Sequence, residues 1–220
     1  MAEYTTPDRR RVALLTIEGQ RDFTHGSSPV RTSGTGQAIP NAHDLVEAFR
    51  HCSLPIFHLV RLYRPDGSNV DLCRRRAVEE GMRILMPGTF GAELVDELKP
   101  SLSVRLEPST LLEGGFQEIG PQEWVHYKPR WGGFYATKLE SRLRELDVNT
   151  LVICGCNFPT AARATVYEAS ERDFRVVVAS DALCGSSEDG LTELGRIGVH
   201  LMRTRNCLDW LNGKISPSAA

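Results

Sequence analysis

The stretch LVICGCNFPTAARATVYEAS, residues 151–170, joins a short apolar run to a helical pattern through a glycine turn. The run LVIC is typical of a strand buried on both faces, and Pro159 suits the first turn of the helix that follows. A sharp strand-to-helix turn of this kind is where many α/β enzymes hold a nucleophile. Here the first helical turn reads Thr160, Ala161, Ala162, so the place for a nucleophile contains alanine.

On both sides of this turn, apolar runs alternate with helical patterns. Strands are expected at residues 11–17, 55–62, 123–128, 150–155 and 174–181, with an ambiguous short strand at 103–108. Helices are expected at residues 40–52, 70–82, 135–148, 159–173 and 187–201, with a short helix within 88–98. This alternation predicts a single α/β domain over residues 1–220. We expect a three-layer α/β/α, Rossmann-like fold with a mostly parallel sheet of about six strands.

Two charged residues follow predicted strands directly. Parallel sheets bind ligands beyond the carboxyl ends of their strands, which is where Glu18 and Lys128 stand. A carboxylate at the end of a buried strand is costly unless it is paired, so Glu18 is a candidate functional residue. Two plainer interpretations stay open, in which Glu18 braces a loop and Lys128 is a surface lysine.

The composition excludes several classes of partner. With 26 basic and 28 acidic residues the net charge is −2, which gives no electrostatic case for nucleic acid or an anionic membrane. The arginines at 74–76 are interpreted as a solvated helix face. No apolar run approaches the roughly 18 residues of a membrane span, and no signal-peptide core opens the chain, so we expect a cytoplasmic protein. The six cysteines show no zinc-like spacing and are expected to be free thiols, mostly buried.

Three motifs, in this order, resemble the isochorismatase-like cysteine hydrolase family over residues 11–203. ALLTIEGQRDF (13–23) resembles an apolar strand followed by Asp-x-Gln-x-Asp-Phe, and Lys128 to Phe134 matches Lys-x-x-x-x-x-Phe. GCNFPTAARATVYEA (155–169) resembles the family's glycine turn, helix and threonine. The resemblance implies an amidohydrolase that cleaves non-peptide amide, lactam or ureido C–N bonds of small molecules. An isochorismate-type hydrolase of a vinyl ether is an alternative.

The resemblance also implies a catalytic triad of Asp, Lys and Cys with a thioester intermediate. Carried over to this chain, Glu18 takes the place of Asp, Lys128 matches, and Ala161 occupies the nucleophile position. Backbone N–H groups at Asn157, Phe158 and Ala161 are expected to form the oxyanion hole. A non-proline cis peptide is common in this turn of the family, and we expect it near residues 156–158.

Both departures from the triad bear on activity. Glutamate adds a methylene to the carboxylate arm, and alanine cannot attack a carbonyl, so this chain is expected to be inactive through the family's covalent route. We favour an engineered Cys→Ala change, because the surrounding turn and Lys128 are intact. Glu18 supports the alternative, a natural non-catalytic ligand-binding or structural paralogue. Cys156 and Cys184 are weaker candidates for a displaced nucleophile.

Aromatic and polar side chains near the strand ends are the candidates for substrate binding: Phe23, Arg61, Tyr63, Asn69, Trp131, Phe134 and Tyr135. The expected partners are a small amide or ureide substrate and further copies of the chain, as a homo-oligomeric dimer or tetramer. No cofactor and no metal are expected. Nicotinamidase-type relatives carry Asp-x-His and further histidines near the second strand, whereas His58 has no matching partner here and is interpreted as structural.

Overall fold

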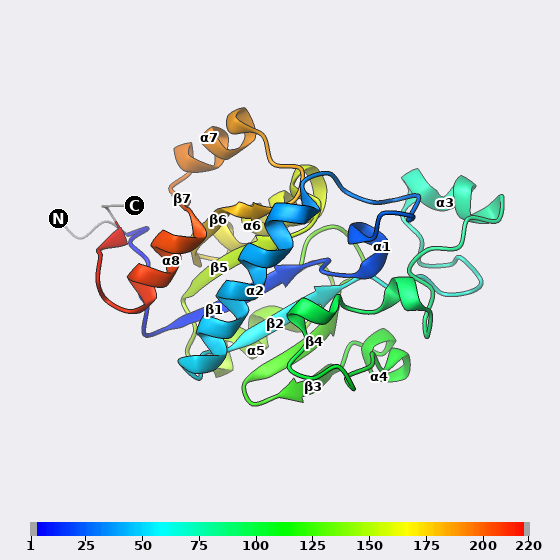
Figure 1. The fold of residues 1–220 in the computed structure, drawn as a ribbon, viewed down its shortest axis with the longest axis horizontal. Helices are drawn as coiled ribbons and strands as arrows, with labels where there is room; N and C mark the ends of the chain where they lie inside the picture. Colours follow the sequence, from blue (N-terminus) through cyan, green and yellow to red (C-terminus); the bar gives the residue numbers. More distant parts are fainter. Residues whose placement is uncertain (1–3, 218–220) are drawn as a thin grey trace.

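The computed structural model describes residues 4–217, within which seven strands form one sheet (Figure 1). The strand order is β3-β4-β2-β1-β5-β6-β7. The strands are β1 (Val12–Ile17), β2 (Ile56–Val60), β3 (Phe116–Gly120), β4 (Glu123–Tyr127), β5 (Thr150–Gly155), β6 (Arg175–Leu183) and β7 (His200–Met202). All neighbouring strands are parallel except β3 and β4, which form an antiparallel hairpin. The predicted α/β fold with a mostly parallel sheet is therefore confirmed.

Helices cover both faces of the sheet and produce the three layers (Figure 1). Alternate residues of β1 point to opposite faces, as the period of a strand requires. Val12 and Leu14 pack in one apolar cluster with α2 (Thr35–His51) and α8 (Thr204–Leu211). Ala13 and Leu15 pack in a second cluster with α5 (Leu139–Glu145), α6 (Arg163–Ser170) and Leu194 of α7 (Glu188–Arg196).

Shorter elements occupy the connections. These are α1 (Arg21–Thr24), α3 (Leu72–Glu79), α4 (Pro108–Leu112), the 3-10 turns Phe90–Ala92 and Asp96–Leu98, and a π-helical turn at Phe158–Ala162. The helix α3 lies beyond the carboxyl ends of the strands, away from both covering layers (Figure 1). In the part of the chain described here, no helix is both long enough and apolar enough to cross a membrane.

Several predicted boundaries are wrong for identifiable reasons. The helix expected from Pro40 begins at Thr35 instead, because Ala38 and Ile39 are buried against the sheet and extend the helix past an exposed proline. The helix expected over 187–201 ends early, since Gly198 has a φ of 86° and the chain then turns into β7. No strand forms at 103–108, where Pro108 instead begins α4.

A buried polar network joins three strands beneath α2. His58 lies between two partners, with Nδ1 2.8 Å from Thr16 Oγ1 and Nε2 2.8 Å from Glu123 Oε1. Arg50 of α2 donates to both oxygens of Glu123, at 2.8 and 2.7 Å. Burial opposes ionisation of Glu123, but the hydrogen bonds from Arg50 and His58 outweigh it and lower its pKa to about 2. The network agrees with a structural role for His58.

This network predicts a loss of stability in acid. The pKa of Glu123 lies near 2 in the folded chain and 4.5 when unperturbed, so unfolding takes up a proton between these values. Its contribution is complete above pH 4.5 and is lost as the pH falls toward 2, by about 3 kcal/mol in total. Urea denaturation of wild type and Glu123→Gln across this range measures it. The variant is expected to be less stable at pH 7 and to vary less with pH.

The matched control is Glu47→Gln, because Glu47 also pairs with Arg50 but is half exposed. It should leave the pH profile close to wild type. Equal acid dependence in wild type and Glu123→Gln would show that other carboxylates dominate.

Candidate active site

Glu18 and Lys128 meet at the carboxyl edge of the sheet, although 110 residues separate them in the chain. Glu18 directly follows β1 and Lys128 directly follows β4, and β2 lies between these strands. The Lys128 ammonium donates to Glu18 Oε1, and both side chains are almost entirely buried. Burial lowers the pKa of Lys128, and the Glu18 carboxylate opposes this shift. The structure thus brings together two of the three predicted triad positions.

The backbone around this pair is held by specific hydrogen bonds. Glu18 adopts a left-handed conformation with a φ of 49°, which is strained for a residue with a side chain. Its N–H donates to Leu59 O at 2.9 Å. Gln20, from the same motif, bonds both backbone groups of Arg61, at 2.8 Å each, and so ties the end of β1 to the end of β2. Sequence reasoning missed this role, although Gln20 belongs to the quoted motif.

The turn after β5 closes against the end of β1. Gly155 has a φ of 114°, and a side chain there would place its Cβ 2.3 Å from Ile17 O. The N–H of Cys156 donates to the same Ile17 oxygen at 2.6 Å. Only glycine permits this approach, which sets the turn beside Glu18.

The turn continues through Asn157, whose φ is 70°, into the π-helical segment that contains Ala161. Ala161 is fully buried. Its carbonyl accepts from Thr165 Oγ1 at 2.8 Å, and the same hydroxyl accepts from Gly133 N at 3.1 Å. Thr165 thereby connects Ala161, the predicted nucleophile position, to the loop after Lys128.

Two expectations for this turn need correction. Among residues 4–217 no peptide bond is cis, so the cis bond expected near residues 156–158 does not form. The left-handed conformation of Asn157 makes the sharp reversal instead. The N–H of Phe158 donates to Cys184 O at 2.9 Å and is therefore not free to bind an oxyanion. Asn157 and Ala161 remain candidate positions for that role.

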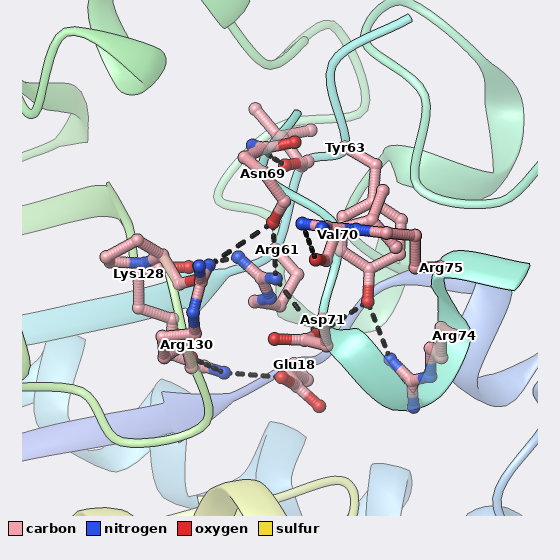
Figure 2. Close-up of polar contacts among 12 residues, drawn as sticks. Glu18, Arg61, Tyr63, Asn69, Val70, Asp71, Arg74, Arg75, Lys128 and Arg130 are labelled. Carbon is pink, nitrogen blue, oxygen red and sulfur yellow. Dashed lines mark hydrogen bonds and ion pairs between the residues drawn. The ribbon is translucent and has the colours of Figure 1, made fainter. Parts of the chain in front are cut away.

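Three of the seven predicted substrate-binding residues form a largely buried polar support. Arg61 donates to Lys128 O at 2.8 Å and to Asp71 at 3.0 Å (Figure 2). Tyr63 donates to the same Asp71 oxygen at 2.7 Å, and burial raises its pKa to about 12, so it stays protonated. Asn69 donates to Leu62 O and to a tyrosine hydroxyl, each at 2.8 Å. This network holds the loops around the ion pair.

Two predicted aromatic residues belong to the core. Phe134 packs against Phe174, with ring centroids 5.7 Å apart, in the cluster below the site. Its side chain is therefore held in the core, and its contact with substrate stays a prediction. Phe23 is completely buried in the cluster beneath α2, and Arg74 lies 5.5 Å from its ring centroid. Phe23 thus supports the site rather than lining an open surface.

Arg74 corrects the interpretation of residues 74–76 as a solvated face. Its side chain turns inward from α3 and donates to Tyr63 Oη at 3.0 Å (Figure 2). Burial opposes its charge, but Tyr63 and Glu18 outweigh this effect and raise the pKa of Arg74. No local pattern distinguishes Arg74 from its neighbours, because its inward direction depends on where α3 docks.

A largely apolar hollow of about 560 Å³ opens between α3, α6 and the loop after Lys128, and neither Glu18, Lys128 nor Ala161 lines it. Trp131 and Tyr135, both predicted to contact substrate, line it together with Arg130. The carbonyl of Arg130 accepts from Lys128 Nζ at 3.2 Å, so the hollow adjoins the buried pair. A larger hollow of about 700 Å³ is lined by residues 6–10, by Arg175 at the start of β6 and by residues 213–217. It therefore lies at the end of the sheet opposite to Glu18 and Lys128. Among the described residues, no cluster of three or more His, Cys, Asp or Glu side chains is arranged to hold a metal.

Comparison with known proteins finds relatives along most of the chain. The isochorismatase domain family matches residues 12–195. A probable inactive nicotinamidase of Arabidopsis thaliana is 29% identical over 196 residues, covering 86% of this chain and 91% of the relative. A ureidoacrylate amidohydrolase of Methylobacterium radiotolerans is 28% identical over 163 residues, covering 68% of this chain but only 56% of the relative.

Solved structures show the same fold. An isochorismatase family protein from Desulfovibrio vulgaris superposes with a TM-score of 0.77 at 28% identity, covering 92% of this chain and 98% of that one. A cysteine hydrolase from Pseudomonas syringae reaches a TM-score of 0.78 at 18% identity, covering 98% and 100%. The second likeness concerns the fold alone.

The buried ion pair generates a prediction for stability. Removing one partner leaves an uncompensated buried charge, so Lys128→Met is expected to destabilise the chain by about 3–5 kcal/mol. Glu18→Gln combined with Lys128→Met should cost less than the sum of the single changes. A double-mutant cycle measured by urea denaturation gives the coupling.

The control cycle uses Arg11 and Asp147, an ion pair with both side chains exposed. Its coupling should stay below about 1 kcal/mol. Additive effects at Glu18 and Lys128 would contradict a tight buried pair.

Proposed function

The chain belongs to the isochorismatase family of hydrolases, and on that basis we propose that it contains an amidohydrolase site. This site binds a small amide or ureide but lacks the thiol that covalent hydrolysis requires. The buried contact between Glu18 and Lys128 is the observation that carries this proposal. A buried ion pair is weak evidence for stability, because apolar replacements are often as stable. Its presence beside the turn that contains Ala161 therefore favours a role toward a ligand.

In the proposed chemistry, a thiol at position 161 gives its proton to the Glu18 carboxylate, and the thiolate attacks the carbonyl carbon. The amine then leaves with that proton, and water hydrolyses the thioester. The Lys128 ammonium favours both anionic groups. A methyl group has no electron pair to donate, so Ala161 stops the sequence before its first bond.

Cys156 is a poor substitute for the missing sulfur. Its Sγ lies 2.9 Å from Cys184 Sγ, and this contact together with burial raises the pKa of the Cys156 thiol. The thiolate, which is the nucleophilic form, is therefore disfavoured. We assign no catalytic role to Cys156 or Cys184.

The amidohydrolases among the relatives support a C–N bond as the target. The Arabidopsis relative, named as a probable inactive nicotinamidase, supports the view that members of this family lose activity. The codon for residue 161 in the source gene separates the two origins of Ala161. A cysteine codon supports an engineered change, and an alanine codon supports a natural ligand-binding paralogue.

Restoring sulfur tests the function directly. Ala161→Cys is expected to hydrolyse at least one member of a panel of amides, lactams and ureides, with the products identified by mass spectrometry. The rate should exceed that of the chain with Ala161 by about 10²-fold or more, because removing a nucleophile typically costs far more than that. A vinyl ether in the panel tests the isochorismate-type alternative.

The matched control is Ala161→Ser, which adds a hydroxyl of similar size but much lower nucleophilicity. Adding Lys128→Met or Glu18→Gln to Ala161→Cys should abolish the gain. Circular dichroism and thermal melting establish that each variant is folded. A folded Ala161→Cys protein without turnover would contradict a latent hydrolase, and binding without turnover would favour the paralogue.

We expect the ligand to contact the protein at the hollow lined by Trp131 and Tyr135. Trp131 is 45% exposed and lines it, so binding of a panel amide or ureide is expected to change tryptophan fluorescence. Trp131→Ala should weaken binding, measured by isothermal titration calorimetry because the variant lacks the fluorescent reporter, by about 5- to 10-fold, the effect of losing roughly 1 kcal/mol of aromatic contact.

Tyr4→Ala is the control, because Tyr4 is 96% exposed and lies outside this hollow. Equal affinity in wild type and Trp131→Ala would place the ligand elsewhere.

A further inference from the structure

Four buried cysteines gather in the cluster beneath α2. Cys154, Cys156, Cys184 and Cys207 are completely inaccessible to solvent, whereas Cys52 and Cys73 are exposed. Cys156 directly follows β5 and Cys184 directly follows β6, which are neighbours in the sheet. Neither thiol has a place in the chemistry proposed above.

The sulfurs of Cys156 and Cys184 lie 2.9 Å apart. A disulfide requires about 2.05 Å between sulfurs, so a movement of less than about 1 Å would join them. The backbone already holds the two residues together, since Cys184 N donates to Gly155 O at 2.9 Å and Phe158 N donates to Cys184 O at 2.9 Å. Both thiols are free in this structure.

We propose that Cys156 and Cys184 form a reversible disulfide, with a peroxide as the oxidant, that ties the active-site turn to the end of β6. One thiolate attacks a peroxide oxygen, which gives a sulfenic acid and releases water. The second sulfur attacks the sulfenic sulfur, the S–S bond forms, and a second water leaves. Two electrons pass from the sulfur pair to the peroxide, and a dithiol reverses the step by exchange.

The position of this bond gives it a structural consequence. Cys156 begins the turn that runs through Asn157 to Ala161, and Cys184 is followed by Gly185, where an added Cβ would lie 3.5 Å from Pro159. A cross-link at this point joins β5 and β6 where the turn leaves the sheet. The closed loop spans 28 residues, which is long enough to restrict the unfolded chain substantially.

Burial of Cys156 and Cys184 slows their oxidation but does not prevent it. The contact with Cys184 and burial raise the pKa of the Cys156 thiol, so few thiolates are present at neutral pH. Oxidation therefore proceeds through local opening of the turn, and the disulfide then disfavours that opening.

The experiment uses the full chain with Cys52→Ser and Cys73→Ser, which leaves the four buried thiols. The protein is exposed to hydrogen peroxide under conditions that oxidise Cys52 and Cys73 in the parent chain. It is then denatured and alkylated, and its free thiols are counted. Two of four thiols are expected to disappear, with a mass loss of two hydrogen atoms and a cross-linked peptide containing residues 156 and 184. The melting temperature should rise by about 5–10 °C and return with dithiothreitol.

Cys184→Ala and Cys207→Ala, each in the same background, form the matched pair. Both remove a buried thiol from one cluster, but among the described residues Cys207 makes no hydrogen bond to Cys156 or Cys184. Cys184→Ala should prevent the disulfide and the rise in melting temperature, while Cys207→Ala should retain both. Persistence of all four thiols would overturn the proposal. A cross-link through Cys154 or Cys207 would also overturn it, and the peptide masses show this even if one variant fails to fold.

Discussion

The ion pair of Glu18 and Lys128 is the contact on which the arrangement of the site depends. Two opposite charges buried at the edge of a sheet must meet, because neither tolerates burial alone. Lys128, at the end of β4, therefore meets Glu18, at the end of β1, across the intervening strand β2. Arg61 fixes the carbonyl of Lys128, and Gln20 fixes Arg61, so the surrounding loops converge on the same pair.

The turn after β5 joins this arrangement at the end of β1. Gly155 permits close approach to β1, and Thr165 connects Ala161 to the loop that follows Lys128. Under the proposed function the buried ion pair is explained by a polar ligand, since a purely structural role would be served equally well by apolar packing.

The face of the sheet beneath α2 buries two groups of polar side chains, an ionic network around Glu123 and a pair of thiols. Glu123 is ionised there because Arg50 and His58 both donate to it. Cys156 and Cys184 meet at the other end of the same layer, where the strand ends leave the sheet. The first network stabilises the strands, and the second acts on the turn that carries Ala161. The Glu123 network thus supports the strands at all times, whereas under the proposed disulfide the rigidity of the turn after β5 depends on oxidation.

Sequence alone determined the family, the fold class and two charged residues at strand ends, because apolar periodicity and short motifs report local burial and turn chemistry. It did not reveal β3 or β7: β7 has only three residues and lay inside a helical pattern. The tertiary structure alone decided that Arg74 turns inward, that Phe134 packs in the core and that two sulfurs meet. Each outcome depends on which distant segments become neighbours, and a pattern of nearby residues does not encode that information.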